Sequence, residues 1–125
     1  MRRHALDYAP LVGDALPSFA PELERLLAAE SSELAAQVGG LHLVGPCLCR
    51  QSDCATFHVT SDRAAPPAPG YGANELECLD LEAEGGLVVV DVEGGRLRTV
   101  EVLGRDDVER ELDAVIPPRS VSRVV

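Results

Sequence analysis

The chain has 125 residues, which is the length of one domain and enough to bury a hydrophobic core without disulfides or metals. Its formal net charge is −10, and such a field repels phosphate backbones and anionic lipid, so we expect no nucleic-acid or membrane role. The charge instead favours a basic protein partner or a cation, or it serves solubility alone.

The first 20 residues hold Pro10, Gly13 and Pro17 among scattered apolar residues, and they predict an irregular arm that can include a helical turn. We expect this arm to pack on the domain through Leu6, Tyr8, Leu11 and Leu16. The N-terminus has no continuous apolar run of the kind found in a signal peptide. The longest apolar run, residues 87–90, is too short to span a bilayer. We therefore expect a cytoplasmic protein, in which cysteines are usually reduced or bound to metal.

Residues 21–38 show the clearest helical pattern in the chain. Pro21 suits the first helical position, where its missing N–H is not needed, and Gly39-Gly40 supplies the stop. One stripe at helical spacing is formed by Leu23, Leu26, Leu27, Leu34 and Val38. The pair Ser31-Ser32 is a weak point at which this helix can split in two.

Two strands are predicted next, over residues 41–46 and 54–60, and the polar residues 50–53 between them make a hairpin with a bulky tip. Residues 62–74 are rich in Pro, Gly and Ala and are longer than most loops in compact domains, so we interpret them as a flexible loop.

Three further strands are predicted over residues 76–83, 87–92 and 97–103, with turns at Gly85-Gly86 and Gly94-Gly95. A two-residue turn at Gly94-Gly95 sets Glu93 opposite Arg96 and Asp91 opposite Arg98, and both pairs have opposite charges.

The same logic at Gly85-Gly86 sets Glu84 opposite Leu87. One face of the meander then becomes apolar and core-facing, and the other becomes acidic, with Cys78, Asp80, Glu82, Asp91 and Arg98. The carboxylates of Asp80, Glu82 and Asp91 can bind a cation or act as an acid/base pair, and they can also simply form a solvated strand face.

Residues 105–116 predict a short helix that Asp106 or Asp107 can cap and that Pro117-Pro118 ends. The expected architecture is therefore α+β: an N-terminal helix packed on a mostly antiparallel sheet of about five strands, made of a hairpin and a three-stranded meander, with a short C-terminal helix. We expect residues 1–125 to form a single domain.

The chemically distinctive residues cluster in the segment Pro46–Thr60, which contains Cys47, Cys49, Cys54 and His58. The spacing C-x-C-x4-C, together with the distant Cys78, can deliver four thiolates to a tetrahedral Zn²⁺, and His58 can replace Cys78 as the fourth ligand.

Other interpretations of the cysteines stay open beside zinc. They can be reduced structural thiols, or they can form the disulfides Cys47–Cys78 with Cys49–Cys54, or Cys47–Cys54 with Cys49–Cys78. Alternatively Cys54 or a neighbouring cysteine serves a thiol-dependent enzyme or redox sensor, with His58 or His42 as the base for Cys54.

The segments LHLVGPCLCRQSDCATFHV and GGLVVVDVEGGRLRTVEVL, followed by IPP, resemble a group of small uncharacterised bacterial proteins with a cysteine hairpin. The resemblance covers residues 41–118 and implies a shared α+β fold, but no particular activity. Our leading hypothesis is a non-enzymatic interaction module in which the cysteine hairpin is stiffened or clipped by zinc and the acidic face meets a basic partner protein.

Overall fold

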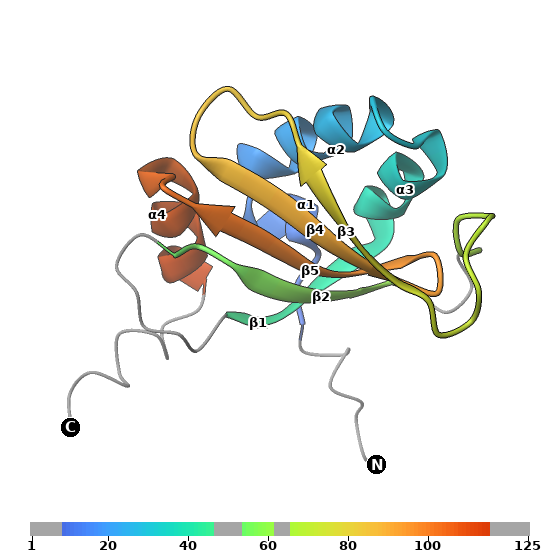
Figure 1. Ribbon diagram of the computed structural model, residues 1–125. Helices are drawn as coiled ribbons and strands as arrows, with labels where there is room; N and C mark the ends of the chain where they lie inside the picture. The colour runs from blue at the N-terminus through green and yellow to red at the C-terminus, as the bar shows by residue number, and fades with distance from the viewer. Residues whose placement is uncertain (1–8, 47–53, 62–65, 116–125) are drawn as a thin grey trace, which may run out of the picture.

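The computed structural model describes residues 9–46, 54–61 and 66–115, which form a five-stranded antiparallel sheet with helices on one of its faces (Figure 1). The strands lie in the order β1-β2-β5-β4-β3, and each neighbouring pair is antiparallel. Their bounds are Leu41–Pro46 for β1, Phe57–Ser61 for β2, Leu76–Leu81 for β3, Leu87–Glu93 for β4 and Arg96–Leu103 for β5. The predicted α+β class is confirmed, and the pairing of β2 with β5 joins the hairpin to the meander.

The predicted helix over residues 21–38 is split at the serine pair into α2 (Phe19–Ala28) and α3 (Ser32–Gln37). The Ser31 hydroxyl accepts a hydrogen bond from the Leu34 N–H at 3.2 Å and so caps α3. Helix α2 begins two residues before Pro21, so this proline is not at the first helical position as expected. It still lies in the first turn, where backbone N–H groups have no partner within the helix.

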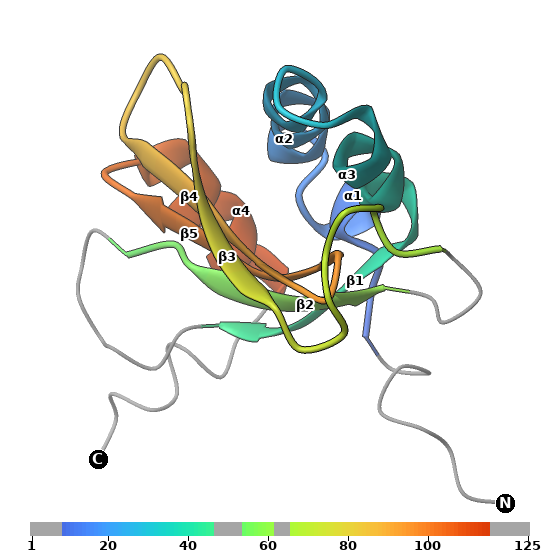
Figure 2. The same cartoon turned by 45° about the vertical axis from the view of Figure 1, so that its right-hand side comes forward.

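Helices α1 (Val12–Ala15), α2 and α3 gather over one face of the sheet, and the 3₁₀ turn η2 (Val38–Gly40) leads from them into β1 (Figure 2). Their apolar sides and the facing side chains of the sheet form one core. Phe19 of α2 and Phe57 of β2 meet there edge to face, with ring centroids 6.3 Å apart. Helix α4 (Asp106–Val115) buries Val108 and Leu112 in the same core.

The β4–β5 turn is the predicted two-residue turn, since Gly94 and Gly95 both have positive φ, and Glu93 faces Arg96 as expected. The expected pairing of Asp91 with Arg98 is wrong, because Asp91 faces Thr99. Arg98 is an extra residue in β5, a β-bulge that shifts every later position by one.

This bulge has a direct effect on the core. It turns Val100 and Val102 toward the helices, where both are fully buried, although the unbroken register would have put them on the acidic face. A second bulge lies in β1, where Val44 is the extra residue between Leu43 and Gly45 and is 57% exposed.

In the β3–β4 hairpin the expected pairing of Glu84 with Leu87 is also wrong, because Leu81 pairs with Val88. The connection is a longer loop in which Gly86, with φ +67°, takes the left-handed conformation. The real register differs from the predicted one by two residues. Because side chains alternate with a period of two, that shift leaves each residue of β3 on its predicted face.

Residues 66–75 run against the Gly94-Gly95 turn. The Ala68 N–H donates to the Gly95 carbonyl at 2.8 Å, and the buried Gln37 side chain donates to the same carbonyl at 2.7 Å. Gln37 also accepts from the Leu97 N–H at 3.1 Å, so α3 is tied to the start of β5. Residues 62–65 lie outside the described residues, and the flexibility expected for 62–74 stays a prediction.

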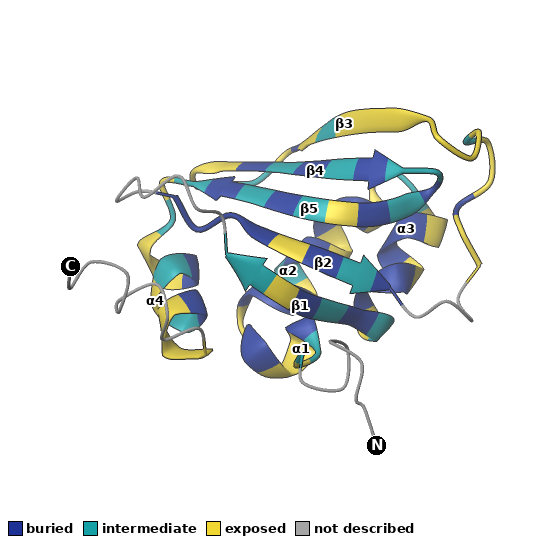
Figure 3. Ribbon diagram, turned by 90° about the horizontal axis from the view of Figure 1, so that it is seen from below, coloured by how far each residue is buried: buried dark blue, intermediate teal, exposed yellow. Residues whose placement is uncertain are grey.

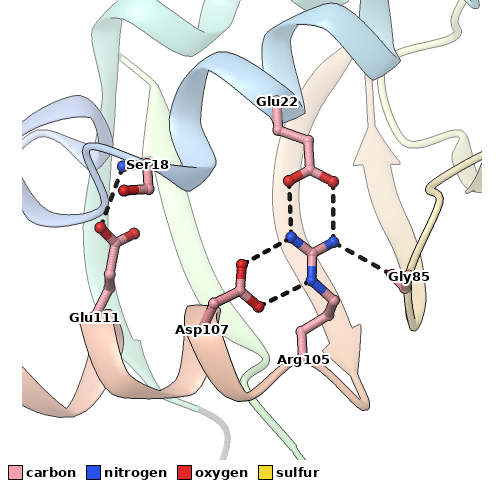
Figure 4. Close-up of polar contacts among 6 residues, drawn as sticks. All are labelled: Ser18, Glu22, Gly85, Arg105, Asp107 and Glu111. Atoms are coloured by element: carbon pink, nitrogen blue, oxygen red, sulfur yellow. Dashed lines mark hydrogen bonds and ion pairs between the residues drawn. The ribbon is translucent and has the colours of Figure 1, made fainter.

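Arg105 links three elements at the other end of the sheet (Figure 4). Its guanidinium donates to both carboxylate oxygens of Glu22 in α2, at 2.9 and 2.8 Å, to Asp107 in α4, and to the Gly85 carbonyl in the β3–β4 loop. It also lies 5.8 Å from the ring centroid of Phe19. These hydrogen bonds hold the pKa of the Glu22 carboxyl below its ordinary value and raise the pKa of Arg105. We interpret this cluster as a structural tie between α2 and α4.

Candidate functional site

One face of the sheet is turned away from α1, α2 and α3, and we call it the open face (Figure 3). Its central polar side chains come from four strands and belong to His58, Cys78, Asp80, Asp91, Thr99 and Glu101, and the apolar Val89 lies between Asp80 and Glu101. Such a one-sided sheet normally alternates apolar residues toward the core with polar residues toward water. Burial alternates in this way along β4, whose outward residues are apolar at Leu87 and Val89 and acidic at Asp91 and Glu93. Polar side chains on the open face are therefore expected in a sheet of this kind. The distribution of charge on the molecule says more about its possible partners.

Charge on the molecule is strongly uneven. Residues 64–95 contain seven carboxylates and no Arg, Lys or His, so they contribute −7 to the formal net charge of −10. Five of these carboxylates lie on β3 or its flanks, are all exposed, and are called here the acidic edge: Glu75, Glu77, Asp80, Glu82 and Glu84. The negative potential is therefore concentrated along one side of the sheet.

β3 is the outermost strand of the sheet, and its first three residues are exposed (Figure 3). Leu76 at its start is 69% exposed, although it is a large apolar residue. The opposite edge, β1, has a partner: the Leu43 N–H donates to the Pro10 carbonyl at 2.8 Å, and Leu11 bridges to His42. Within the described ranges, β3 is therefore the sheet edge that no other segment pairs.

Cys78 lies at the centre of β3, directly across from Asp91, and its thiol donates a hydrogen bond to the Asp91 carboxylate at 2.9 Å. One ligand atom each from Cys78, Asp91 and Glu101 lies within 4.8 Å of the other two. The hydrogen bond to Asp91, followed by desolvation and the surrounding negative charges, raises the pKa of the Cys78 thiol to about 11. At neutral pH this thiol is therefore protonated and a poor nucleophile.

The loop before β3 is tied to the acidic edge. The Tyr71 hydroxyl donates to Glu77 at 2.7 Å, and the Gly72 N–H donates to Glu75 at 3.0 Å. Burial and the hydrogen bond to Glu77 raise the pKa of Tyr71 to about 12, so its hydroxyl stays a donor throughout the physiological range. These contacts fix the direction of the chain as it enters β3.

The predicted cysteine site is only partly within the described residues, since Cys47 and Cys49 lie outside them. Cys54 is buried and bridges to Leu103 near the end of β5, whereas Cys78 pairs with Asp91 across the sheet. These two positions are three strand spacings apart across the sheet, which is at least about 14 Å, so the structure does not bring them together. Zinc binding through Cys47 and Cys49 stays a prediction.

His58, the predicted substitute ligand, lies on the open face with its Nδ1 3.2 Å from the Thr99 hydroxyl. Among the described residues, the group of metal-ligating side chains that the structure assembles is Cys78 with Asp91 and Glu101. Glu101 was not identified from the sequence, because the bulge at Arg98 exchanges the two faces of the sheet for every later residue of β5 and so puts Glu101 on the open face.

Comparisons with protein-family models, with curated proteins and with solved structures found no match for this chain. No helix within residues 9–46, 54–61 and 66–115 is long and apolar enough to cross a membrane.

Proposed function

We propose that this protein is a binding module that takes up a basic, extended segment of a partner protein along β3. The single observation that carries the proposal is the coincidence of the unpaired sheet edge with the acidic edge. An extended peptide can add a strand to such an edge, with main-chain hydrogen bonds giving affinity and charge giving selectivity.

The register supports this use of β3. The Gly94 N–H donates to the Glu75 carbonyl at 2.8 Å, so residues 75 and 94 form a hydrogen-bonded pair. Backbone groups alternate in an antiparallel ladder, and those of Glu77, Leu79 and Leu81 therefore point toward β4. The N–H and C=O groups of Leu76, Cys78 and Asp80 point outward, where an incoming strand can pair with them.

Charge selects the kind of segment. Pairing of β3 with the same strand of a second copy would bring two acidic edges together, which disfavours self-association and is a known protection of exposed edges. A segment with Lys or Arg at alternate positions would instead place its cations near Glu77 on one face or near Asp80 on the other. The central thiol, Cys78, is small and uncharged and leaves room for a neighbouring strand.

The alternative of a thiol-dependent enzyme finds little support at the two described cysteines. Cys54 is only 6% exposed, and the Cys78 thiol has a raised pKa, which is the opposite of what a nucleophile needs.

The proposal is tested by titrating the full chain with a peptide of alternating Lys and Val residues and measuring its Kd by calorimetry. Asp80→Asn should weaken binding about two- to fivefold, as expected for one exposed charge pair. The matched control is Glu24→Gln, which removes one exposed carboxylate from α2 and should have no effect beyond the small change in net charge.

A backbone variant tests the mode of binding. Leu76→Pro removes one outward N–H without touching the β3–β4 ladder, charge or thiol, and should weaken the same peptide about threefold to tenfold. Equal losses for Asp80→Asn and Glu24→Gln would reduce the interaction to general charge attraction. An unchanged Kd for a folded Leu76→Pro variant would rule out strand addition at this edge.

A further inference from the structure

A second feature of the open face lies away from the acidic edge, over β1, β2 and the first half of β5. It is a hollow of about 610 Å³, a size that suits a small ligand. The side chains that matter for its chemistry are Val44, His58, Thr60, Arg96, Arg98 and Thr99.

The two β-bulges of the sheet both border this hollow. The extra residues, Val44 in β1 and Arg98 in β5, lie on either side of β2 and both line it. Bulges bend a strand and redirect a side chain, and they are frequent beside functional sites. Both extra residues of the sheet therefore contribute side chains to the hollow.

The charged side chains that line the hollow differ from those of the chain as a whole. None of the nine described residues that line it is acidic, although Asp and Glu number 21 in the chain. Both arginines that the described strands contain, Arg96 and Arg98, are among these nine residues. Two guanidinium groups therefore gather in one concave place on a protein of net charge −10, where Arg98 is also paired with Glu93.

The donors in the hollow suit an oxyanion. The Arg96 guanidinium donates to the Ser61 hydroxyl at 3.0 Å, which restricts its position over β2. Arg98 forms an ion pair with Glu93, and one carboxylate uses at most two of the five N–H donors of a guanidinium. The Thr60 hydroxyl supplies a further donor beside these planar groups, and the Thr99 hydroxyl, which already contacts His58 Nδ1 at 3.2 Å, lies next to it.

We propose that this hollow binds a small organic anion through a phosphate or carboxylate group, held by Arg98 and Arg96. The anion competes with Glu93 for Arg98, which gives the site a distinctive response to substitution. The proposal is independent of strand addition at β3, because it uses β1, β2 and β5.

The test is an NMR titration of the full chain with inorganic phosphate and, separately, with succinate, at constant ionic strength. We expect saturable shifts of the Thr60 and Thr99 amides in the millimolar range for at least one anion. Saturation by phosphate alone identifies a phosphate group as the ligand chemistry, and saturation by succinate alone identifies a carboxylate.

Three variants test the site, and two of them should change the affinity for the anion in opposite directions. Arg98→Gln should weaken binding at least about tenfold, as expected for loss of a charge-assisted contact. Glu93→Gln should tighten binding, because it removes the competing carboxylate. Arg110→Gln, an exposed control on α4, should change nothing.

The amide spectrum of each variant shows whether it keeps the fold, and the Glu93→Gln result stands even where Arg98→Gln is disturbed. Shifts that stay linear for both anions would overturn the proposal. Equal effects of Arg98→Gln and Arg110→Gln would overturn it as well.

Discussion

The contact between Cys78 and Asp91 makes a quantitative prediction about thiol reactivity. A thiol with a pKa of about 11 is about one part in a thousand thiolate at about pH 8, whereas the ordinary value of 9.0 gives about one part in ten. Asp91→Asn removes the carboxylate that accepts the hydrogen bond and contributes most to the raised pKa.

The expected change in rate is smaller than the hundredfold change in thiolate. A thiolate of lower pKa is a weaker nucleophile, with a Brønsted coefficient of ~0.5, and this removes about a factor of ten. Desolvation and the charges of Glu101 and Asp80 remain in Asp91→Asn, so alkylation of Cys78 at about pH 8 should be faster than in the unaltered chain by up to about tenfold.

The assay is the rate of iodoacetamide labelling, followed by mass spectrometry of the peptide that carries Cys78 in the full chain. The control is Asp80→Asn, which removes a neighbouring exposed carboxylate that makes a smaller contribution and should change the rate less than about twofold. Rapid labelling of Cys78 in the unaltered chain at mildly acidic pH would show that its pKa is not raised. An unchanged labelling rate in Asp91→Asn would show that Asp91 is not the cause.

Two further predictions concern stability. Gly95→Ala should lower the free energy of unfolding by about 2–4 kcal/mol, because φ is +83° and a Cβ would lie 2.5 Å from the Ala68 carbonyl oxygen. Gly39→Ala, whose Cβ would meet no atom within 4 Å, should cost less than about 1 kcal/mol in the same urea titration. Equal costs for the two glycines would contradict the packing of residues 66–75 on the turn. Glu22→Gln should destabilise the chain by about 1–2 kcal/mol near neutral pH through its lost bonds to Arg105. Because the pKa of Glu22 is lowered in the folded state, its contribution is present above its ordinary value of 4.5 and is lost as the pH falls through the lower folded value. The difference between the two chains should therefore close in acid, and a difference that is independent of pH would argue against the tie.

The strands could be predicted from the sequence because their apolar residues alternate and their turns carry paired glycines. The expected strand 41–46 coincides with β1, and the turn at Gly94-Gly95 has the expected geometry. The split of the N-terminal helix was foreseen at the serine pair, since serine favours caps over helix interiors.

The bulges were harder to predict, because one extra residue is a local event that depends on packing from both sides. A signal was nevertheless present in β5, where the core residues Leu97, Val100 and Val102 are spaced by three and then two. The odd spacing marks Arg98 as the extra residue. The hollow over β1, β2 and β5 could not be predicted, because it depends on this bulge and on the pairing of β2 with β5. No local sequence pattern specifies that pairing.

The acidic edge was visible as a run of 32 residues, 64–95, without a basic residue, but its place at the rim of the sheet depends on the strand order. The predicted site at the cysteine hairpin rested on the clustering of rare residues in the sequence. The structure instead places Cys78 among carboxylates, away from Cys54.

The most direct test of strand addition is amide hydrogen exchange in β3 with and without the Lys and Val peptide at saturation. The outward amides of Leu76, Cys78 and Asp80 should gain protection when the peptide binds, because they acquire hydrogen-bond partners. The inward amides of Glu77 and Leu79, already paired with β4, should change much less. Protection that rises equally at all five amides, or at none of them, would contradict the account.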